Sequence, residues 1–136
     1  MNPIDMRRRA ESARVGRLAT VDLAGRPHLV PICFVVIAET AYSAVDQKPK
    51  RHAALRRLAN IEATGHASVL VDGYSEDWSA LWWVRMDGEG RIVRSQEEAD
   101  RALGGLVDKY DQYSAAPPPG PVIAVDIHSW RGWSAS

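Results

Sequence analysis

Hydrophobic and polar residues follow one another along this chain mainly with the two-residue period of β-strands. Six segments are rich in β-branched, aromatic and other apolar residues and are separated by turn residues. They predict strands at residues 16–21, 28–37, 41–45, 66–72, 78–93 and 121–128. Residues 87–90, with the sequence DGEG, interrupt the fifth segment, which indicates either a bulge or a tight turn there.

The second predicted strand is almost continuously apolar. Residues 30–37 read VPICFVVI, a run expected of a strand that is covered on both faces of a sheet. Pro31 fits an edge strand or a bulge instead, because proline cannot donate a hydrogen bond to a neighbouring strand. Before this strand, residues 22–27 carry the turn residues of a hairpin, with Gly25 suited to a positive φ.

Helical periodicity is limited to two or three segments. Helices are expected at residues 3–13, after residue 51 as far as about Asn60, and directly after Ser95. Ser95 and Glu98 form a capping-box pattern, in which each side chain satisfies a free backbone donor of the other residue. Six strands with two or three helical insertions predict a mostly β, α+β fold, a small barrel rather than a doubly wound sheet. At 136 residues, one domain spanning residues 1–136 is expected.

The composition is that of an ordinary globular protein and argues against several kinds of partner. The 17 Lys and Arg balance 17 Asp and Glu, so no broad basic field is expected to bind nucleic acid or acidic lipid. No segment has membrane-spanning length, and the N-terminus lacks the apolar core of a signal peptide. Cys33 is the only cysteine, so nothing requires an oxidising compartment. We therefore expect a cytoplasmic protein with no nucleic-acid or membrane partner.

One segment concentrates positive charge. From Lys48 to Arg57 there are five basic residues and no acid. Lys48, Lys50 and Arg51 lie where a predicted strand gives way to a helix, so their cations and the free N–H groups of the helix start could converge on a phosphate. A charged run at a helix start is also common on solvated surfaces, although basic residues there oppose the helix dipole. From the residues alone, both interpretations stay open.

Other chemistry has less support in the sequence. The serines lack a Gly-x-Ser-x-Gly context and the four histidines are dispersed, so no catalytic residue or metal ligand is assigned. Trp83 and Arg85 share one face of a predicted strand, where the indole could stack on a planar ring and the guanidinium could approach its anionic part. The alternative is that Trp78, Trp82 and Trp83 fill a core or a subunit interface, which suits Trp82 better than Trp83.

Four motifs occur in a characteristic order, namely GRLATVD at residues 16–22, GRPHLVP at 25–31, KPKR at 48–51 and LWWVR at 81–85. Together they resemble the pyridoxamine 5'-phosphate oxidase-like flavin and deazaflavin proteins over nearly the whole chain. The similarity is greatest to the actinobacterial branch that depends on coenzyme F420, which also carries a closing Trp-x-Gly-Trp, here residues 130–133. The arginine and lysine that flank the ring-binding strand of the flavin-using vitamin enzymes are absent, which argues against pyridoxamine phosphate oxidation.

The resemblance implies a split β-barrel homodimer with a cofactor groove at the dimer interface. The cofactor would be coenzyme F420 or, alternatively, FMN, with its phosphate on the basic segment, its ring along residues 29–32 and its ribityl chain beside residues 42–43. Trp83 and Arg85 would lie near the substrate mouth. The predicted cofactor-binding residues are Leu29, Val30, Pro31, Ile32, Tyr42, Ser43, Lys48, Lys50, Arg51, Trp83 and Arg85.

These features predict a reductase that transfers a hydride from reduced coenzyme F420 to a small unsaturated organic acceptor. Such a transfer needs no catalytic acid or nucleophile, because the protein mainly positions the donor and the acceptor. A substrate proton could come from Tyr74, His28 or water. The alternatives are an FMN-binding oxidoreductase of the same fold and a carrier that binds a flavin or F420 without turnover.

Overall fold

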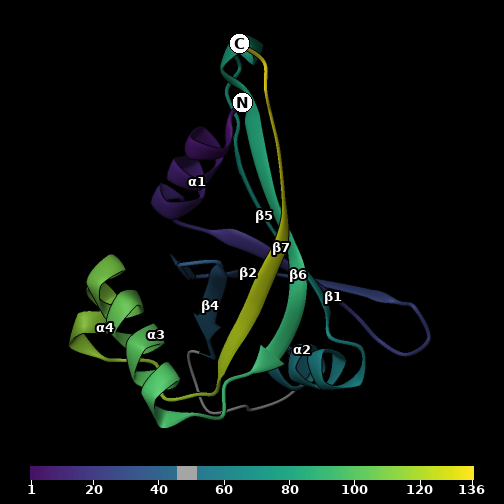
Figure 1. Ribbon diagram of the computed structural model, residues 1–136, viewed down its shortest axis with the longest axis vertical. Coiled ribbons are helices and arrows are strands. Elements are labelled where there is room, and N and C mark those ends of the chain that lie inside the picture. Colours follow the sequence, from purple (N-terminus) through teal and green to yellow (C-terminus); the bar gives the residue numbers. More distant parts are fainter. Residues whose placement is uncertain (46–51) are drawn as a thin grey trace.

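The computed structural model describes residues 1–45 and 52–136, and it consists of one curved antiparallel sheet with helices packed against it (Figure 1). The strands are β1 Gly16–Val21, β2 Pro27–Ile32, β3 Val35–Ile37, β4 Thr40–Ala44, β5 His66–Gly73, β6 Trp82–Ile92 and β7 Val122–Ser134. Their order across the sheet is β2-β1-β5-β6-β7-β4-β3. The helices are α1 Pro3–Ser12, α2 His52–Ala63, α3 Gln96–Lys109 and α4 Asp111–Ala115, with a short 3-10 helix, η1, at Trp78–Ala80. The fold is therefore mostly β, and the sheet curls into a half barrel.

The described strands number seven, which corrects the prediction of six. The segment predicted as one strand at residues 28–37 is divided into β2 and β3, because the chain leaves the sheet at Cys33 and Phe34. The Phe34 amide donates to the Tyr110 hydroxyl at 3.1 Å, and the Phe34 carbonyl accepts from Lys109 Nζ at 2.9 Å. Side chains at the end of α3 thus replace a neighbouring strand as partners of this backbone.

Strand β2 lies at an edge of the sheet, and within a single chain it exposes one of its faces, so the expected covering of both faces is not met by one subunit alone. Leu29 is 66% exposed, whereas Ile32 is buried. The edge position agrees with the prediction made from Pro31, whose missing N–H is tolerated on a strand with only one neighbour. The predicted hairpin turn before β2 is confirmed, with Gly25 at a φ of +82°.

A bulge interrupts the pairing of the two longest strands, β6 and β7. Asp87 pairs with Ser129 but Gly88 pairs with Ile127, so His128 is passed over. The bulge predicted within residues 87–90 is confirmed and the alternative of a tight turn was wrong, because β6 continues without a turn to Ile92. The largest differences in strand boundaries are that residues 78–80 form η1 rather than strand and that β7 extends to Ser134.

The described chain contains four α-helices rather than two or three. The three predicted helices correspond to α1, α2 and α3, while the five-residue α4 was missed. Ser95 caps α3 by accepting a hydrogen bond from the Glu98 amide at 3.1 Å, as the capping box predicted. The Glu98 carboxylate does not complete the box, because it accepts hydrogen bonds from Arg91 and Tyr42 instead. No helix in the described part of the chain is long and apolar enough to cross a membrane.

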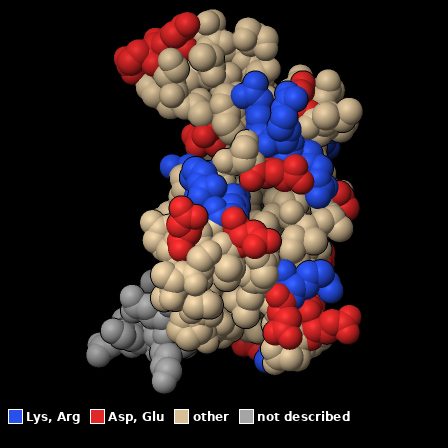
Figure 2. Space-filling view, turned by 90° about the vertical axis from the view of Figure 1, so that its left-hand side faces the viewer, with Lys and Arg blue, Asp and Glu red and all other residues tan. Residues whose placement is uncertain are grey.

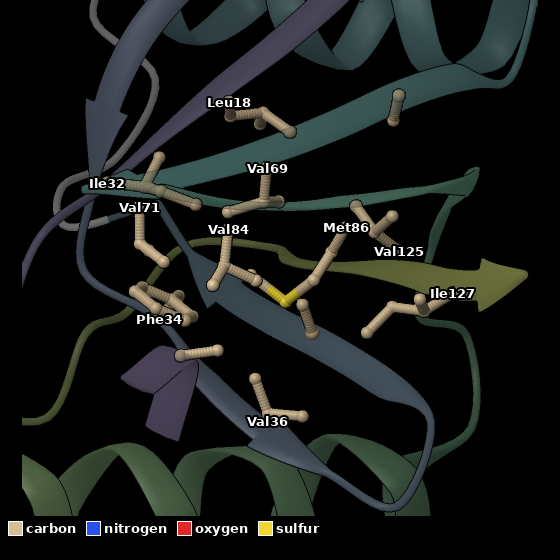
Figure 3. Packing of buried hydrophobic residues seen from close by; sticks show 13 residues of the cluster. Leu18, Ile32, Phe34, Val36, Val69, Val71, Val84, Met86, Val125 and Ile127 are labelled. Carbon is tan, nitrogen blue, oxygen red and sulfur yellow. The ribbon is translucent and has the colours of Figure 1, made fainter. Parts of the chain in front are cut away.

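The concave face of the sheet encloses the main hydrophobic core (Figure 3). Phe34 lies in it among Leu18, Val69, Val84 and Met86, all of them almost completely buried. Helix α1 packs against this core, and α3 and α4 cover the opposite face of β4 and β7. The strand residues that point away from the core on β1, β2, β5, β6 as far as Asp87 and the second half of β7 have no described helix over them. That uncovered surface is called the open face below.

Candidate functional site

The predicted ring-binding strand borders a hollow at the end of β2. The hollow has a volume of about 170 Å³. The residues that line it are Val15, Pro31, Ile32, Cys33, Ala44 and Arg57. Because Ala44 is the last residue of β4, the chain passes from this hollow towards the basic segment. The predicted phosphate ligands Lys48, Lys50 and Arg51 lie outside the described residues.

Arg57 contributes the cationic side chain among the residues that line this hollow. It belongs to the second turn of α2, and the remaining lining residues are apolar apart from the Cys33 thiol. Apolar walls combined with a guanidinium suit a ligand that is a hydrophobic ring system with an anionic substituent. The sequence analysis counted Arg57 within the basic segment but did not place it in the site, since its position depends on how α2 packs against the sheet.

The four predicted ring contacts on β2 do not share one face. Leu29 and Pro31 are exposed on the open face, whereas Val30 packs against the core and Ile32 is buried. Successive side chains of a strand point to opposite faces, so four consecutive residues cannot all face one ring. A ring lying along β2 could therefore contact the side chains of only one pair, together with the backbone of the other.

The side chain of Tyr42 packs against α3. It is 3% exposed, and its hydroxyl donates a hydrogen bond of 2.7 Å to Oε2 of Glu98. Burial, followed by the hydrogen bond to Glu98, raises the pKa of this phenol above its usual value. Ser43 is also buried but points to the other face of β4. If Tyr42 contacts a ribityl chain as predicted, it therefore does so through its backbone rather than its ring.

A second and wider hollow lies on the open face. Trp83 and Arg85 line it together with Leu70 and Asp72, and its volume is about 340 Å³. The Arg85 guanidinium carbon lies 5.7 Å from the centre of the Trp83 ring, and Arg85 Nε donates to Asp87 at 2.8 Å. The prediction that Trp83 and Arg85 share a face is confirmed.

Trp82 points the opposite way from Trp83. It packs against the main core, and the guanidinium carbon of Arg9 lies 4.8 Å from the centre of its ring. This orientation agrees with the prediction that Trp82 suits a packing role better than Trp83. Leu70 and Asp72 were missed as neighbours of Trp83, because only the pairing of β5 with β6 brings them together.

Within one chain the two hollows are separated. A row of paired residues crosses the open face from Pro31 through Arg17 and Leu70 to Arg85. Neighbouring strands are about 4.8 Å apart, so Pro31 and Arg85 lie roughly 14 Å from each other across the sheet. The structure thus brings Pro31 and Ile32 together with Arg57, and Trp83 together with Arg85, but it does not join the two sets.

His28 lies on the face of β2 that is turned towards α2. Its Nδ1 atom is buried and has no hydrogen-bond partner among the described residues. Burial lowers the pKa of this imidazole below its usual value, and the positive charges of Arg56 and Arg57 lower it further. His28 was predicted as one possible source of a substrate proton, yet neither His28 nor Tyr74 lines either hollow described above.

The charges of the described surface are mixed. Figure 2 shows basic and acidic side chains interspersed over the face that it presents. Several are paired, among them Arg7 with Glu39 at 2.7 Å. Among the side chains described, those of residues 1–45 and 56–136, no three His, Cys, Asp or Glu come together as metal ligands would.

Comparison with known proteins places this geometry in a family. Residues 4–134 match the family model described as pyridoxamine 5'-phosphate oxidase. A search of curated proteins found no match.

Three solved structures illustrate the likeness in fold. A conserved hypothetical protein from Mycobacterium tuberculosis has a TM-score of 0.79 and 21% identity, over 99% of this chain and 86% of the other. A FAD-binding protein from Mesorhizobium loti has a TM-score of 0.74 and 20% identity, over 97% and 94% of the two chains. The heme storage protein from Vibrio cholerae has a TM-score of 0.71 and 15% identity, over 97% and 93%.

Proposed function

The chain belongs to the pyridoxamine 5'-phosphate oxidase family, and on that premise we propose that it is an oxidoreductase dependent on the deazaflavin coenzyme F420. Its substrate would be a small unsaturated organic acceptor. The hydride would be supplied by the bound, reduced coenzyme, while the protein binds and orients both partners.

The observation that carries this proposal is the hollow formed by Ile32, Ala44 and Arg57. It places an apolar strand end, the end of β4 and a fixed cation around one space. The basic segment begins four residues after Ala44, at Lys48, and would supply further cations for a phosphate. An apolar surface that leads into a cationic end is the arrangement that a ring with a phosphorylated side chain requires.

We further propose that the protein works as a homodimer through its open face. Leu29 is 66% exposed there and Trp133 is 46% exposed, on a sheet surface that no described helix covers. The roughly 14 Å between Pro31 and Arg85 within one chain supports this proposal. A second copy packed on this face would place its own Trp83 and Arg85 closer to the β2 strand of the first.

Two alternatives use the same residues. An FMN-binding oxidoreductase would need the same apolar strand and the same cations, because FMN also combines a ring with a phosphate. A carrier would bind the coenzyme without turnover. Such a carrier needs the same binding surface and no catalytic side chain.

The decisive experiment is a titration of the purified protein with coenzyme F420 and with FMN, followed by the fluorescence of each cofactor. The variant Lys48→Ala/Lys50→Ala should bind the preferred cofactor at least tenfold more weakly, since it loses two charge-assisted contacts to phosphate. A matched control, Arg8→Ala/Arg94→Ala, removes two exposed cations elsewhere and should bind as the unmodified protein does. Equal affinity in the two double variants would contradict the phosphate assignment.

An assay of coenzyme oxidation distinguishes the proposed enzyme from the alternative carrier function. Reduced coenzyme F420 bound to the protein should be oxidised when quinones, enones or linear tetrapyrroles are offered. If the coenzyme binds but no acceptor oxidises it faster than in free solution, the carrier function is supported instead. If only FMN binds, the FMN-dependent alternative holds.

A further inference from the structure

His28 is held against helix α2 by the register of the sheet. Strand β2 pairs His28 with Thr20 of β1, and the Asn60 amide of α2 donates to the Thr20 hydroxyl at 3.1 Å. Thr20 and Asn60 are both buried. The imidazole therefore lies where α2 crosses the edge of the sheet, with its Nδ1 atom buried and unpaired among the described residues.

The charged groups that act on His28 are cations from one turn of α2. Arg56 and Arg57 precede Asn60 by one helical turn, and both disfavour the protonated imidazole electrostatically. Strand β1 contributes uncharged Thr20 at this point. Arg57 also lines the hollow beside Pro31 and Ile32. One guanidinium thus connects the surroundings of His28 to the proposed cofactor site.

We propose that an anion bound beside Arg56 and Arg57 is taken up together with a proton, and that His28 carries this proton. The identity of the anion as the coenzyme phosphate rests on the proposed function. In the free protein, the two arginines and the lack of a partner for Nδ1 favour neutral imidazole. An anion reverses this balance, because it offsets the guanidinium charges that disfavour the imidazolium.

Proton uptake makes anion affinity depend on pH. By reciprocity, a rise of one unit in the pKa of His28 on binding corresponds to an affinity about tenfold higher at low pH than at high pH. The affinity is greatest when His28 is protonated in both states and decreases as the pH rises through the midpoint of the bound state. His28 would thus tune the retention of the coenzyme near neutral pH.

The test uses the whole protein and inorganic sulfate, an anion that does not itself titrate between about pH 5 and pH 8. The ring proton signals of the histidines are followed by NMR against pH, with and without sulfate, and His28→Gln identifies the signal of His28. Sulfate should move the midpoint of His28 upward by about one unit. The signal of His66, which is exposed on β5, is the comparison for any general effect of the salt. A His28 midpoint that sulfate leaves unchanged would overturn the proposal.

Coenzyme binding provides a second and independent readout. The affinity of the unmodified protein for coenzyme F420 should decrease about tenfold from pH 5 to pH 8, and His28→Gln should remove this dependence while His66→Gln retains it. Binding that is equally strong at both pH values overturns the proton linkage but leaves the proposed function intact. If sulfate shifts the midpoint of His28 but the protein binds no coenzyme, the proton linkage holds and the proposed function is overturned.

Discussion

The Tyr42 hydroxyl donates a hydrogen bond of 2.7 Å to Oε2 of Glu98, and this contact joins strand β4 to the first turn of helix α3. Arg91 of β6 donates to both oxygens of the same carboxylate and also to Asp126 of β7. Three strands and a helix are thus tied together by one network. Tyr42 takes part in this network, and it is not among the residues that line the hollow beside β2.

Replacing Glu98 with Gln should destabilise the protein by about 1.5–3 kcal/mol at neutral pH, because the carboxylate accepts charge-assisted hydrogen bonds from Arg91 and Tyr42. These bonds hold the pKa of Glu98 at about 2, below its usual 4.5. The stabilisation is therefore present above about pH 4.5 and is lost as the pH falls towards 2.

Urea unfolding at pH 7 and at about pH 3 would check this prediction. The difference between the unmodified protein and Glu98→Gln should be smaller at the lower pH. Glu97→Gln is the matched control, since Glu97 is exposed in the same helical turn and should cost only a few tenths of a kcal/mol. Equal losses in the two variants would show that the network does not stabilise the fold.

The bulge between β6 and β7 should not tolerate a side chain at Gly88. A Cβ atom there would collide with the backbone carbonyl oxygen of Asp126 on the neighbouring strand, so one of the strands would have to move. We expect Gly88→Ala to cost at least about 1–3 kcal/mol in thermal or urea unfolding. Gly104→Ala should instead stabilise α3 by about 0.5–1 kcal/mol, because the added methyl group meets no atom within 4 Å outside its chain neighbours and the adjacent backbone of α3. A similar effect from both substitutions would contradict this picture.

Local patterns in the sequence were sufficient to predict most helices and strands, but not the contacts that these elements make with distant parts of the chain. Alternation predicted β1 with its observed bounds, and a two-residue spacing placed Trp83 and Arg85 on one face. The break at Phe34 could not be predicted, since it depends on a hydroxyl 76 residues further along the chain. The place of Arg57 in the hollow beside β2 was missed for the same reason, because Arg57 reaches this hollow only after α2 has packed against the sheet.

Lys109 should make stability rise with pH in the alkaline range. Burial, with the positive charge of Arg14 as the second cause, lowers the pKa of its amine from 10.5 to about 8. Between these values the unfolded chain binds more protons than the folded protein, so unfolding becomes less favourable as the pH increases. Lys109→Met should abolish a rise on the order of 1–2 kcal/mol between about pH 8 and pH 9.5.

The Phe34 carbonyl should keep a partner in the Lys109→Met variant. The Tyr110 hydroxyl lies 3.2 Å from this oxygen and 3.0 Å from the carbonyl oxygen of the exposed residue Arg14, so its single proton can turn to Phe34 while water serves Arg14. The variant is therefore expected to fold. Urea unfolding of both proteins across the pH range provides the comparison, and parallel stability curves would contradict the prediction.

Leu29→Glu should convert the proposed dimer into a monomer without unfolding the chain. Leu29 is already 66% exposed in a single copy, so a charge there costs the isolated subunit little, whereas the same charge inside an interface would be buried without a partner. Leu23, 82% exposed in the turn between β1 and β2, offers the matched control Leu23→Glu, which should leave the dimer unchanged. Light scattering after gel filtration measures the mass of each protein, and circular dichroism verifies the fold. A Leu29→Glu protein that stays dimeric would exclude this part of the open face from the interface, and coenzyme affinity retained in a monomeric variant would show that the site is complete within one chain.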